Sequence, residues 1–315
     1  MNKKFLRRLA AVGTTACIAI CSVAMLAGCT TSNNPEVRIT YTFNGEDYAV
    51  DYRLSRIDAP QTVQHFIELA DAGFYNGVTI DGTEYKLVVH DYQSSAMHTG
   101  GYYLADSDDD GTPETLTEID YFNTIEALVE SGTTFTQSVW ADEARTQPTY
   151  SVYGEFAGNG VEQENGRELS ATQGALVMFY TDKGNGSEQV WVQRADGGAD
   201  NDGVEYQQLN YEPNSATSLF YTFMGENVPD STNYCVFGMA IDYEGQMTNG
   251  LLAAISEYES TLDEEAEETF TTTQDPYRLN RYDFFEDIRK GDEEAEFETP
   301  VDMPIYIKSV EVTKY

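Results

Sequence analysis

The sequence predicts a mainly β chain that carries a few amphipathic helices. Two alternating apolar runs in residues 37–54 flank Asn44-Gly45, a dipeptide typical of a tight turn between two strands. Residues 58–73 follow with apolar side chains at helical spacing. We therefore expect a hairpin whose apolar face is covered by a helix. Shorter apolar runs with the length of strands recur at 84–89, 174–178 and 304–312.

The predicted first helix has signals at both ends. Asp58 can act as its N-cap, Pro60 fits the first turn, and Gly73 can end it. Its apolar residues recur at i, i+3, i+4 and i+7, so one face can cover a core. These residues are Val63, Phe66, Ile67 and Ala70.

Further elements are predicted along the rest of the chain. Amphipathic patterns indicate helices at 120–131, with Asp120 as cap, and at 239–258 and 275–290. Two short strand-like runs around a Gly/Asp-rich turn predict a hairpin at 183–212. This hairpin either recognises a partner through Trp191 or is an elaboration of the domain.

The first 28 residues have the composition of a secretory signal. Four basic residues precede a short apolar run, and Leu26-Ala27-Gly28 stands before Cys29. This ending resembles the bacterial lipobox, in which the cysteine becomes the lipidated first residue of the mature protein. The alternatives are an ordinary signal peptide or a single transmembrane anchor. The apolar run is short for a transmembrane anchor. A lipid on Cys29 would hold the protein on the extracytoplasmic face of the cell membrane, with residues 29–35 as a polar tether.

The net charge excludes some classes of binding partner, and the cysteine content excludes a disulfide in the mature chain. The net charge is −36, and it becomes −40 without the four basic residues of the signal. Nucleic acid and anionic lipid are not expected as partners, because both need basic patches. Cys17 and Cys21 lie in the signal and Cys29 is the expected anchor, so Cys235 has no disulfide partner and is expected to be buried.

An acidic loop is a candidate calcium site. Alternating carboxylates ahead of Gly111 can converge on one hard cation while the glycine makes the turn. The candidate ligands are Asp106, Asp108, Asp110 and Glu114. The position at which an EF-hand needs glutamate is Thr117, so the segment is either a short structural calcium loop or a solvated acidic loop. No other cofactor is expected.

Several segments resemble one known family in the same order along the chain. They are DAPQTVQHFIELADAGFYNG at 58–77, YGEF at 153–156, PNSATS at 213–218, YCVFG at 234–238 and the closing PIYIKSVEV. They are similar to motifs of the cyclophilins, which are peptidyl-prolyl cis-trans isomerases. The resemblance covers residues 36–315 and implies a closed antiparallel β-barrel capped by two α-helices, with insertions at about 102–150, 183–212 and 259–299.

The resemblance also implies a site for proline-containing polypeptides. Lys86 falls at the position of the family's catalytic arginine, although it is also readable as an exposed strand lysine. Lysine is not equivalent to arginine where a planar, two-pronged donor is needed. The implied substrate-binding positions are Met97, Thr99, Phe179, Leu219, Tyr221 and Tyr234.

Prolyl isomerisation needs neither a covalent intermediate nor a metal. The amide must rotate over a barrier of roughly 20 kcal/mol, which an apolar pocket and well-placed donors can lower. We therefore expect a membrane-anchored extracytoplasmic isomerase that assists the folding of secreted client proteins, weakened by its altered site. The alternative is an inactive cyclophilin-like protein-binding module. The histidines His65, His90 and His98 lack metal-ligand spacing, and His65 is expected to face solvent.

Overall fold

The computed structural model describes residues 34–80, 82–106, 111–161, 169–180, 189–193, 206–225, 233–263, 268–276 and 296–315. Apart from Tyr315, these residues belong to one compact unit. The expected signal peptide, Cys29 and most of the expected tether lie outside the described residues. No helix in the described part is long and apolar enough to cross a membrane.

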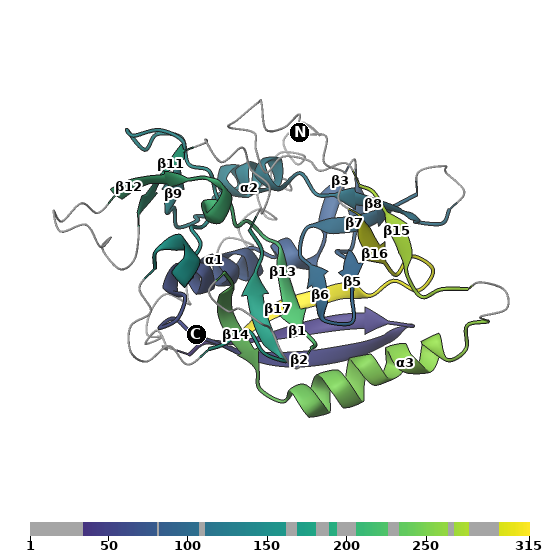
Figure 1. Ribbon diagram of the computed structural model, residues 1–315. Helices are drawn as coiled ribbons and strands as arrows, with labels where there is room; N and C mark the ends of the chain where they lie inside the picture. The colour runs from purple at the N-terminus through teal and green to yellow at the C-terminus, as the bar shows by residue number, and fades with distance from the viewer. Residues whose placement is uncertain are drawn as a thin grey trace, which may run out of the picture. The chain divides into compact units, whose positions relative to one another are not determined.

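An eight-stranded sheet, antiparallel at every pairing, forms the centre of this unit (Figure 1). Its order is β17-β1-β2-β14-β10-β13-β6-β5. The chain is thus mainly β, as the sequence predicts. The strands are β1 (Glu36–Phe43), β2 (Glu46–Leu54), β5 (Asp91–Tyr92), β6 (Ala96–Thr99), β10 (Ala175–Met178), β13 (Phe220–Phe223), β14 (Cys235–Ala240) and β17 (Tyr306–Lys314).

The predicted first hairpin is confirmed. Strands β1 and β2 pair in register from Glu36 with Arg53 to Phe43 with Glu46. Asn44 and Gly45 both have positive φ angles, 49° and 79°, as a tight hairpin turn requires.

The residues just before β5, one edge strand of the sheet, bond to the region of β17, the other edge strand. The predicted strand 84–89 is divided: β4 (Thr83–Tyr85) pairs with β3 (Val78–Ile80), and residues 87–89 run beside β17. The Val89 amide donates to the Ile305 carbonyl at 2.9 Å, and the Ile307 amide donates to the Leu87 carbonyl at 2.8 Å. Complete closure of the barrel stays a prediction.

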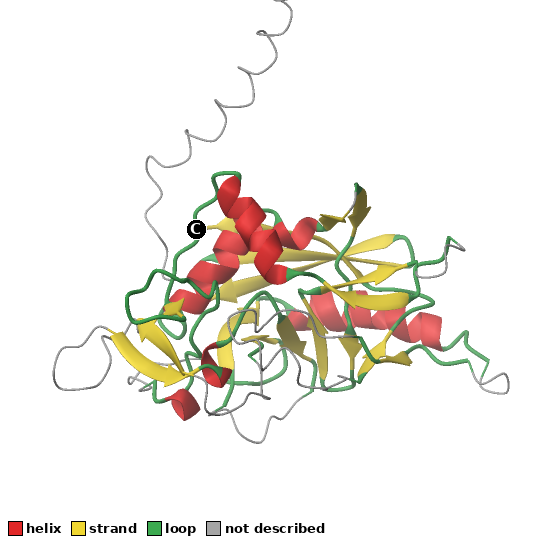
Figure 2. Cartoon of the chain, turned by 90° about the horizontal axis from the view of Figure 1, so that it is seen from above, coloured by secondary structure: helices red, strands yellow, loops and turns green. Residues whose placement is uncertain are grey.

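Helices lie on two sides of the strands (Figure 2). They are α1 (Pro60–Asp71), the short 3-10 turn η1 (Phe74–Asn76), and a π-helical segment η4 (Tyr243–Leu252) that continues into α3 (Ala253–Glu259). Phe66 of α1 and Met247 and Ile255 of the later pair are buried in one apolar core with the strands. The two helices implied by the sequence are therefore present.

The N-terminus of α1 is capped differently from the prediction. Ala59 holds the N-cap position, and the Asp58 carboxylate instead accepts the Ser55 hydroxyl. The buried carboxylate of Glu155 accepts the backbone N–H groups of Gln61 and Thr62, at 3.2 and 2.8 Å. Because this partner lies far along the chain, the local sequence does not reveal it.

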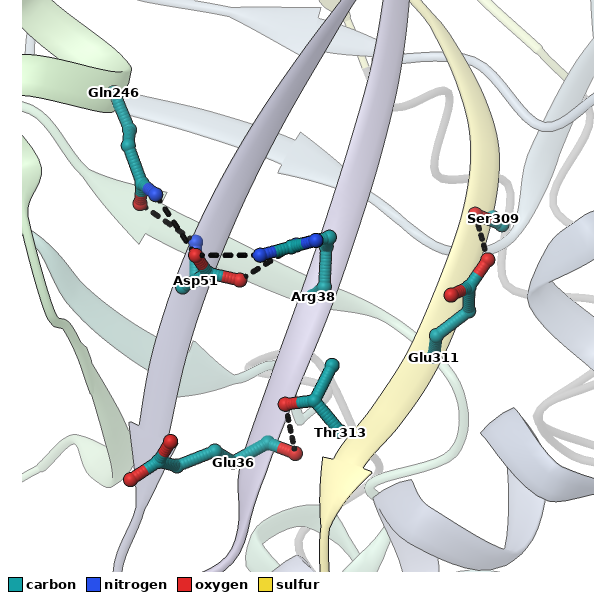
Figure 3. A network of polar contacts seen from close by, with 7 residues as sticks. All are labelled: Glu36, Arg38, Asp51, Gln246, Ser309, Glu311 and Thr313. Carbon is teal, nitrogen blue, oxygen red and sulfur yellow. Dashed lines mark hydrogen bonds and ion pairs between the residues drawn. The ribbon is translucent and has the colours of Figure 1, made fainter.

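A polar network joins the later helix to the outer side of β1 and β2 (Figure 3). Arg38 donates through two nitrogens to the Asp51 carboxylate, at 2.8 and 3.0 Å. The Gln246 amide donates to that carboxylate and accepts the Asp51 backbone N–H, both at 2.8 Å. The paired guanidinium lowers the pKa of Asp51 below its usual value.

The remaining described elements are short and lie outside the eight-stranded sheet. They are β7 (Tyr102–Ala105), β8 (Thr115–Glu118), α2 (Tyr121–Glu130), β9 (Val139–Trp140), η2 (Ala157–Asn159), β11 (Gln189–Gln193), β12 (Tyr206–Asn210), η3 (Glu212–Asn214), β15 (Thr272–Gln274) and β16 (Phe297–Thr299). Helix α2 and its Asp120 cap are confirmed, as is the β11–β12 hairpin. Most of the helix predicted at 275–290 lies outside the described residues.

Candidate functional site

A pocket with aromatic and imidazole walls lies where β6 and β13 meet the chain before β5. It is lined by His90, His98, Phe179, Leu219, Phe220 and Phe297. Its space, including the part open to solvent, is about 240 Å³. The pocket is a small hollow with mainly apolar walls.

The alternation of side chains along β6 directs His98 toward the pocket. On β6, Met97 faces the main core, so its neighbour His98 faces the opposite side. His98 is directly opposite Tyr221 of β13, and their rings meet edge to face with centroids 4.7 Å apart. This cross-strand pair fixes one face of the imidazole.

The His98 imidazole is oriented by Asp91. The two residues are cross-strand partners in the β5–β6 hairpin, and Nδ1 of His98 lies 2.9 Å from Oδ2 of Asp91. The Asp91 side chain is only 4% exposed, whereas that of His98 is 22% exposed. With Nδ1–H donated to the carboxylate, Nε2 is left as the atom that accepts a hydrogen bond when neutral and donates one when protonated.

Other contacts hold the Asp91 carboxylate in place. Its Oδ2 accepts the Gln93 amide at 2.8 Å, and its Oδ1 accepts the Glu298 backbone N–H at 3.2 Å. Glu298 belongs to β16, which also supplies Phe297 to the pocket. Strand β16, which lies in the region expected to be an insertion, thus builds part of the site.

The remaining wall is a stack of rings around His90. Its imidazole lies 4.3 Å from the Tyr102 ring and 4.9 Å from the Phe297 ring, measured between centroids. The His90 carbonyl accepts the Thr299 hydroxyl at 2.6 Å. His90 is buried, so its role here is to form the wall.

The implied substrate-binding residues divide between the pocket and other places. Phe179 and Leu219 line the pocket, and Tyr221 packs beside it on His98. Tyr234 packs on Phe223 in the neighbouring apolar cluster, with ring centroids 5.4 Å apart.

Two further implied residues point elsewhere. Met97 is 1% exposed and lies in the main core. Thr99 is buried, and its hydroxyl donates to the Val88 carbonyl at 2.7 Å. Neither side chain presents itself to a ligand in this arrangement.

Lys86 stands outside the strand in which it was expected. It follows β4 and is exposed, and its Nζ donates to the Asn76 carbonyl at 3.0 Å. Asn76 belongs to η1, not to the pocket wall. The catalytic role implied for Lys86 would require the ammonium to leave this carbonyl, and it stays a prediction.

The candidate calcium loop is described only at its ends. Asp106 accepts the Gly111 amide at 2.8 Å, and the Glu114 amide donates to the Ala105 carbonyl at 3.0 Å. Asp108 and Asp110 lie outside the described residues. Among the residues that are described, no three His, Cys, Asp or Glu side chains gather as a metal site. Calcium at this loop stays a prediction.

The expectation that His65 faces solvent is wrong. His65 is 4% exposed, and its Nε2 lies 2.9 Å from the Thr217 carbonyl. Burial lowers the pKa of His65 to about 4, although the carbonyl opposes this shift. The segment around Thr217 covers a second side of α1, which helical periodicity alone does not indicate. Cys235 is buried, as expected, with its sulfur 3.3 Å from the Thr62 hydroxyl.

Sequence reasoning did not identify His98 and Asp91 as a pair. The available signal was the turn at residues 93–95 between two strand-like runs, because a hairpin there sets Asp91 opposite His98. That turn lacks the Asn-Gly type of dipeptide that marks a hairpin clearly. Phe297 could not be assigned, since it follows a long acidic stretch without a strand pattern.

Comparisons with known proteins leave the family open. No family model matches the chain, and no curated protein matches it. It is similar to a solved cyclophilin-type peptidyl-prolyl cis-trans isomerase of Cryptosporidium parvum, with 13% identity and a TM-score of 0.38, over 90% of this chain and 99% of that one. The same enzyme solved in the presence of the dipeptide Ala-Pro has the same identity and TM-score, over 89% and 99%. Likeness at this level carries no inference about activity.

Proposed function

We propose that this chain is an extracytoplasmic, membrane-anchored peptidyl-prolyl cis-trans isomerase that assists the folding of secreted proteins. The observation that carries the proposal is the aromatic pocket with His98 held by Asp91. The cyclophilin-like segments of the sequence support it independently. A proline ring is small and apolar, as are the walls that Phe179, Leu219 and Phe297 contribute.

The polar edge of the pocket supplies a donor for the twisted amide. When the prolyl bond rotates, the amide loses its resonance, and electron density returns to the nitrogen. A donor placed at that nitrogen stabilises the twisted form more than the planar one, which is the condition for catalysis. Protonated His98 can donate through Nε2 while Asp91 balances its charge. We assign the donor to His98 instead of Lys86.

A catalytically inactive binding module is the second candidate. It is favoured because two donors that the family resemblance implies are already hydrogen-bonded within the protein. Lys86 donates to the Asn76 carbonyl, and Thr99 donates to the Val88 carbonyl. In this case the pocket would hold a proline residue of a client without accelerating its rotation.

Exchange NMR on a short Ala-Pro peptide separates these functions. The soluble chain from Thr30 is compared with the His98→Ala and Lys86→Ala variants. We expect acceleration that is lost in His98→Ala and kept in Lys86→Ala. Acceleration lost only in Lys86→Ala would overturn the assignment to His98. Peptide binding without acceleration would leave the binding module, and neither binding nor acceleration would exclude both functions.

A matched pair of variants tests the pocket itself. Phe179 and Tyr180 are neighbours that are both partly exposed, but only Phe179 lines the pocket. The Tyr180 ring instead stacks on Phe156 at 4.8 Å. Phe179→Ala is expected to weaken peptide binding, and Tyr180→Ala is expected to leave it unchanged.

Membrane anchoring is tested separately. Cys29→Ser removes the thiol to which lipid would be attached, and it should release the protein from the membrane fraction. Mass spectrometry of the wild-type N-terminal peptide should show a diacylated Cys29. An unmodified cysteine, or a variant that stays in the membrane, would contradict lipid anchoring.

A further inference from the structure

The two tryptophans of the chain lie side by side on a small sheet away from the pocket. This sheet has the order β12-β11-β9, and Trp191 of β11 pairs directly with Trp140 of β9. Both side chains are partly exposed. The alternate residues Val139, Val190 and Val192 are fully buried on the other side. The tryptophans therefore occupy the solvent side of the sheet.

A third aromatic ring extends this surface. Tyr206 of β12 pairs with Gln193, so it lies on the same side as Trp191. Its ring meets the Trp140 ring at 5.9 Å between centroids, with an interplanar angle of 70°. The guanidinium of Arg145 lies 3.7 Å from the centre of the Tyr206 ring. We call the surface formed by Trp140, Trp191 and Tyr206 the tryptophan platform.

The loop that carries Arg145 is well ordered by its own hydrogen bonds. The Asp142 carboxylate accepts the amides of Thr146 and Gln147, both at 2.8 Å, and the Asp142 carbonyl accepts the Arg145 amide at 3.0 Å. Arg145 takes a left-handed backbone conformation with φ of 59°. This geometry fixes the cation against one face of Tyr206.

The strands that carry the platform have no charged residue. Their sequences are VW, QVWVQ and YQQLN, in a chain in which 23% of residues are charged and the net charge is −36. Amides flank the rings on the same side. Gln193 stands two residues from Trp191, Gln208 is its cross-strand partner, and Gln189 donates to Asn210 at the other end. Partly exposed aromatic rings are enriched at recognition sites.

We propose that the tryptophan platform binds a neutral carbohydrate chain. The C–H faces of sugar rings are apolar and slightly positive, and they stack on the negative faces of indole rings. Sugar hydroxyls both donate and accept hydrogen bonds, and amide side chains can do the same. An uncharged partner matches strands that carry no charged residue, with the Arg145 cation already stacked on the Tyr206 ring, whereas an anionic polymer would be repelled by the acidic remainder of the chain. This site is independent of the proline pocket, since the two share no residue.

Tryptophan fluorescence tests the proposal directly, because both tryptophans of the chain lie on the platform. The soluble chain from Thr30 is titrated with hexasaccharides of β-1,4-linked glucose and of β-1,4-linked N-acetylglucosamine. A proline-rich peptide and an oligogalacturonate represent two other classes of partner, a polypeptide and an anionic carbohydrate. We expect a saturable change in tryptophan emission with at least one neutral hexasaccharide and none with the oligogalacturonate.

Variants separate recognition from folding. Trp140→Ala and Trp191→Ala should each weaken binding roughly tenfold or more, as truncation of an aromatic anchor does. Trp191→Phe should keep part of the affinity, because it keeps a stacking surface. Tyr180→Ala, a partly exposed aromatic outside the platform, should bind as the wild type does. Emission that changes only with the proline-rich peptide, or with none of the probes, would overturn the proposal, provided that circular dichroism shows folded protein.

Discussion

Glu155 caps the first helix although it lies 93 residues further along the chain: its carboxylate accepts the backbone N–H of Thr62 at 2.8 Å. The carboxylate also accepts the backbone N–H of Gln61 and the Tyr153 hydroxyl, both at 3.2 Å. Burial raises the pKa of Glu155 above its usual value, although these donors oppose the shift. The family-like segment at 153–156 therefore acts structurally, because it closes the N-terminus of α1.

Removing this carboxylate should destabilise the protein. Glu155→Ala removes the acceptor of two backbone N–H groups in the first turn of α1, at a cost of roughly 1–3 kcal/mol for each group left unsatisfied. Urea denaturation measures the loss. Glu244→Ala, an exposed acidic residue in the first turn of η4, should lose less than about 0.5 kcal/mol. Equal losses in the two variants would contradict a capping role for Glu155.

His65 should make the folded state sensitive to mild acid. Its pKa is about 4 in the folded chain, against a usual value of 6.5. The unfolded chain therefore binds the proton first, so this contribution to stability is complete above pH 6.5 and is lost as the pH falls toward 4. The full loss is roughly 3 kcal/mol. In His65→Gln, the free energy of unfolding should fall less between pH 6.5 and 4; an unchanged slope would exclude His65 as its source.

Asp91 should act on ligands through His98. Asp91→Asn replaces the acceptor of Nδ1–H with an amide, so the imidazole loses its fixed tautomer and the anion beside its protonated form. We expect isomerisation of the Ala-Pro peptide to slow about tenfold or more, with a smaller effect on peptide affinity. In the His98→Ala background the same change should have no further effect. Additive losses would show that Asp91 acts by another route.

Gln246 should contribute to stability through the two hydrogen bonds between its side-chain amide and Asp51. Gln246→Ala removes the acceptor of the Asp51 N–H and one donor to its carboxylate, and should cost about 1 kcal/mol. Asn249→Ala, an exposed position of the same helical segment, is the matched control. Thermal denaturation compares the two. A loss confined to Asn249→Ala would show that the network of Figure 3 is not stabilising.

Local patterns predicted the elements that local physics determines. The Asn44-Gly45 turn, the apolar face of α1 and the Asp120 cap each depend on residues close in sequence, and each is confirmed. The burial of His65 and the Glu155 cap depend on segments far along the chain, which periodicity cannot reveal.

The candidate site was predictable only in part for the same reason. Phe179 and Leu219 were found through the family resemblance, and both line the pocket. Met97 and Thr99 occupy matching positions in sequence, but their side chains are buried and Thr99 is bonded to Val88. Phe297 reaches the pocket from a region expected to be an insertion, so no family motif could place it there.

The most direct test of the central claim is chemical-shift mapping of the labelled soluble chain with an Ala-Pro peptide. The claim is that the pocket around His98 accepts a proline residue, whether or not rotation is accelerated. We predict that the His98 imidazole and the amides of Phe179 and Leu219 shift with saturation, while the Trp140 and Trp191 indole signals do not move. Shifts confined to other surfaces, or none at high peptide concentration, would contradict the claim.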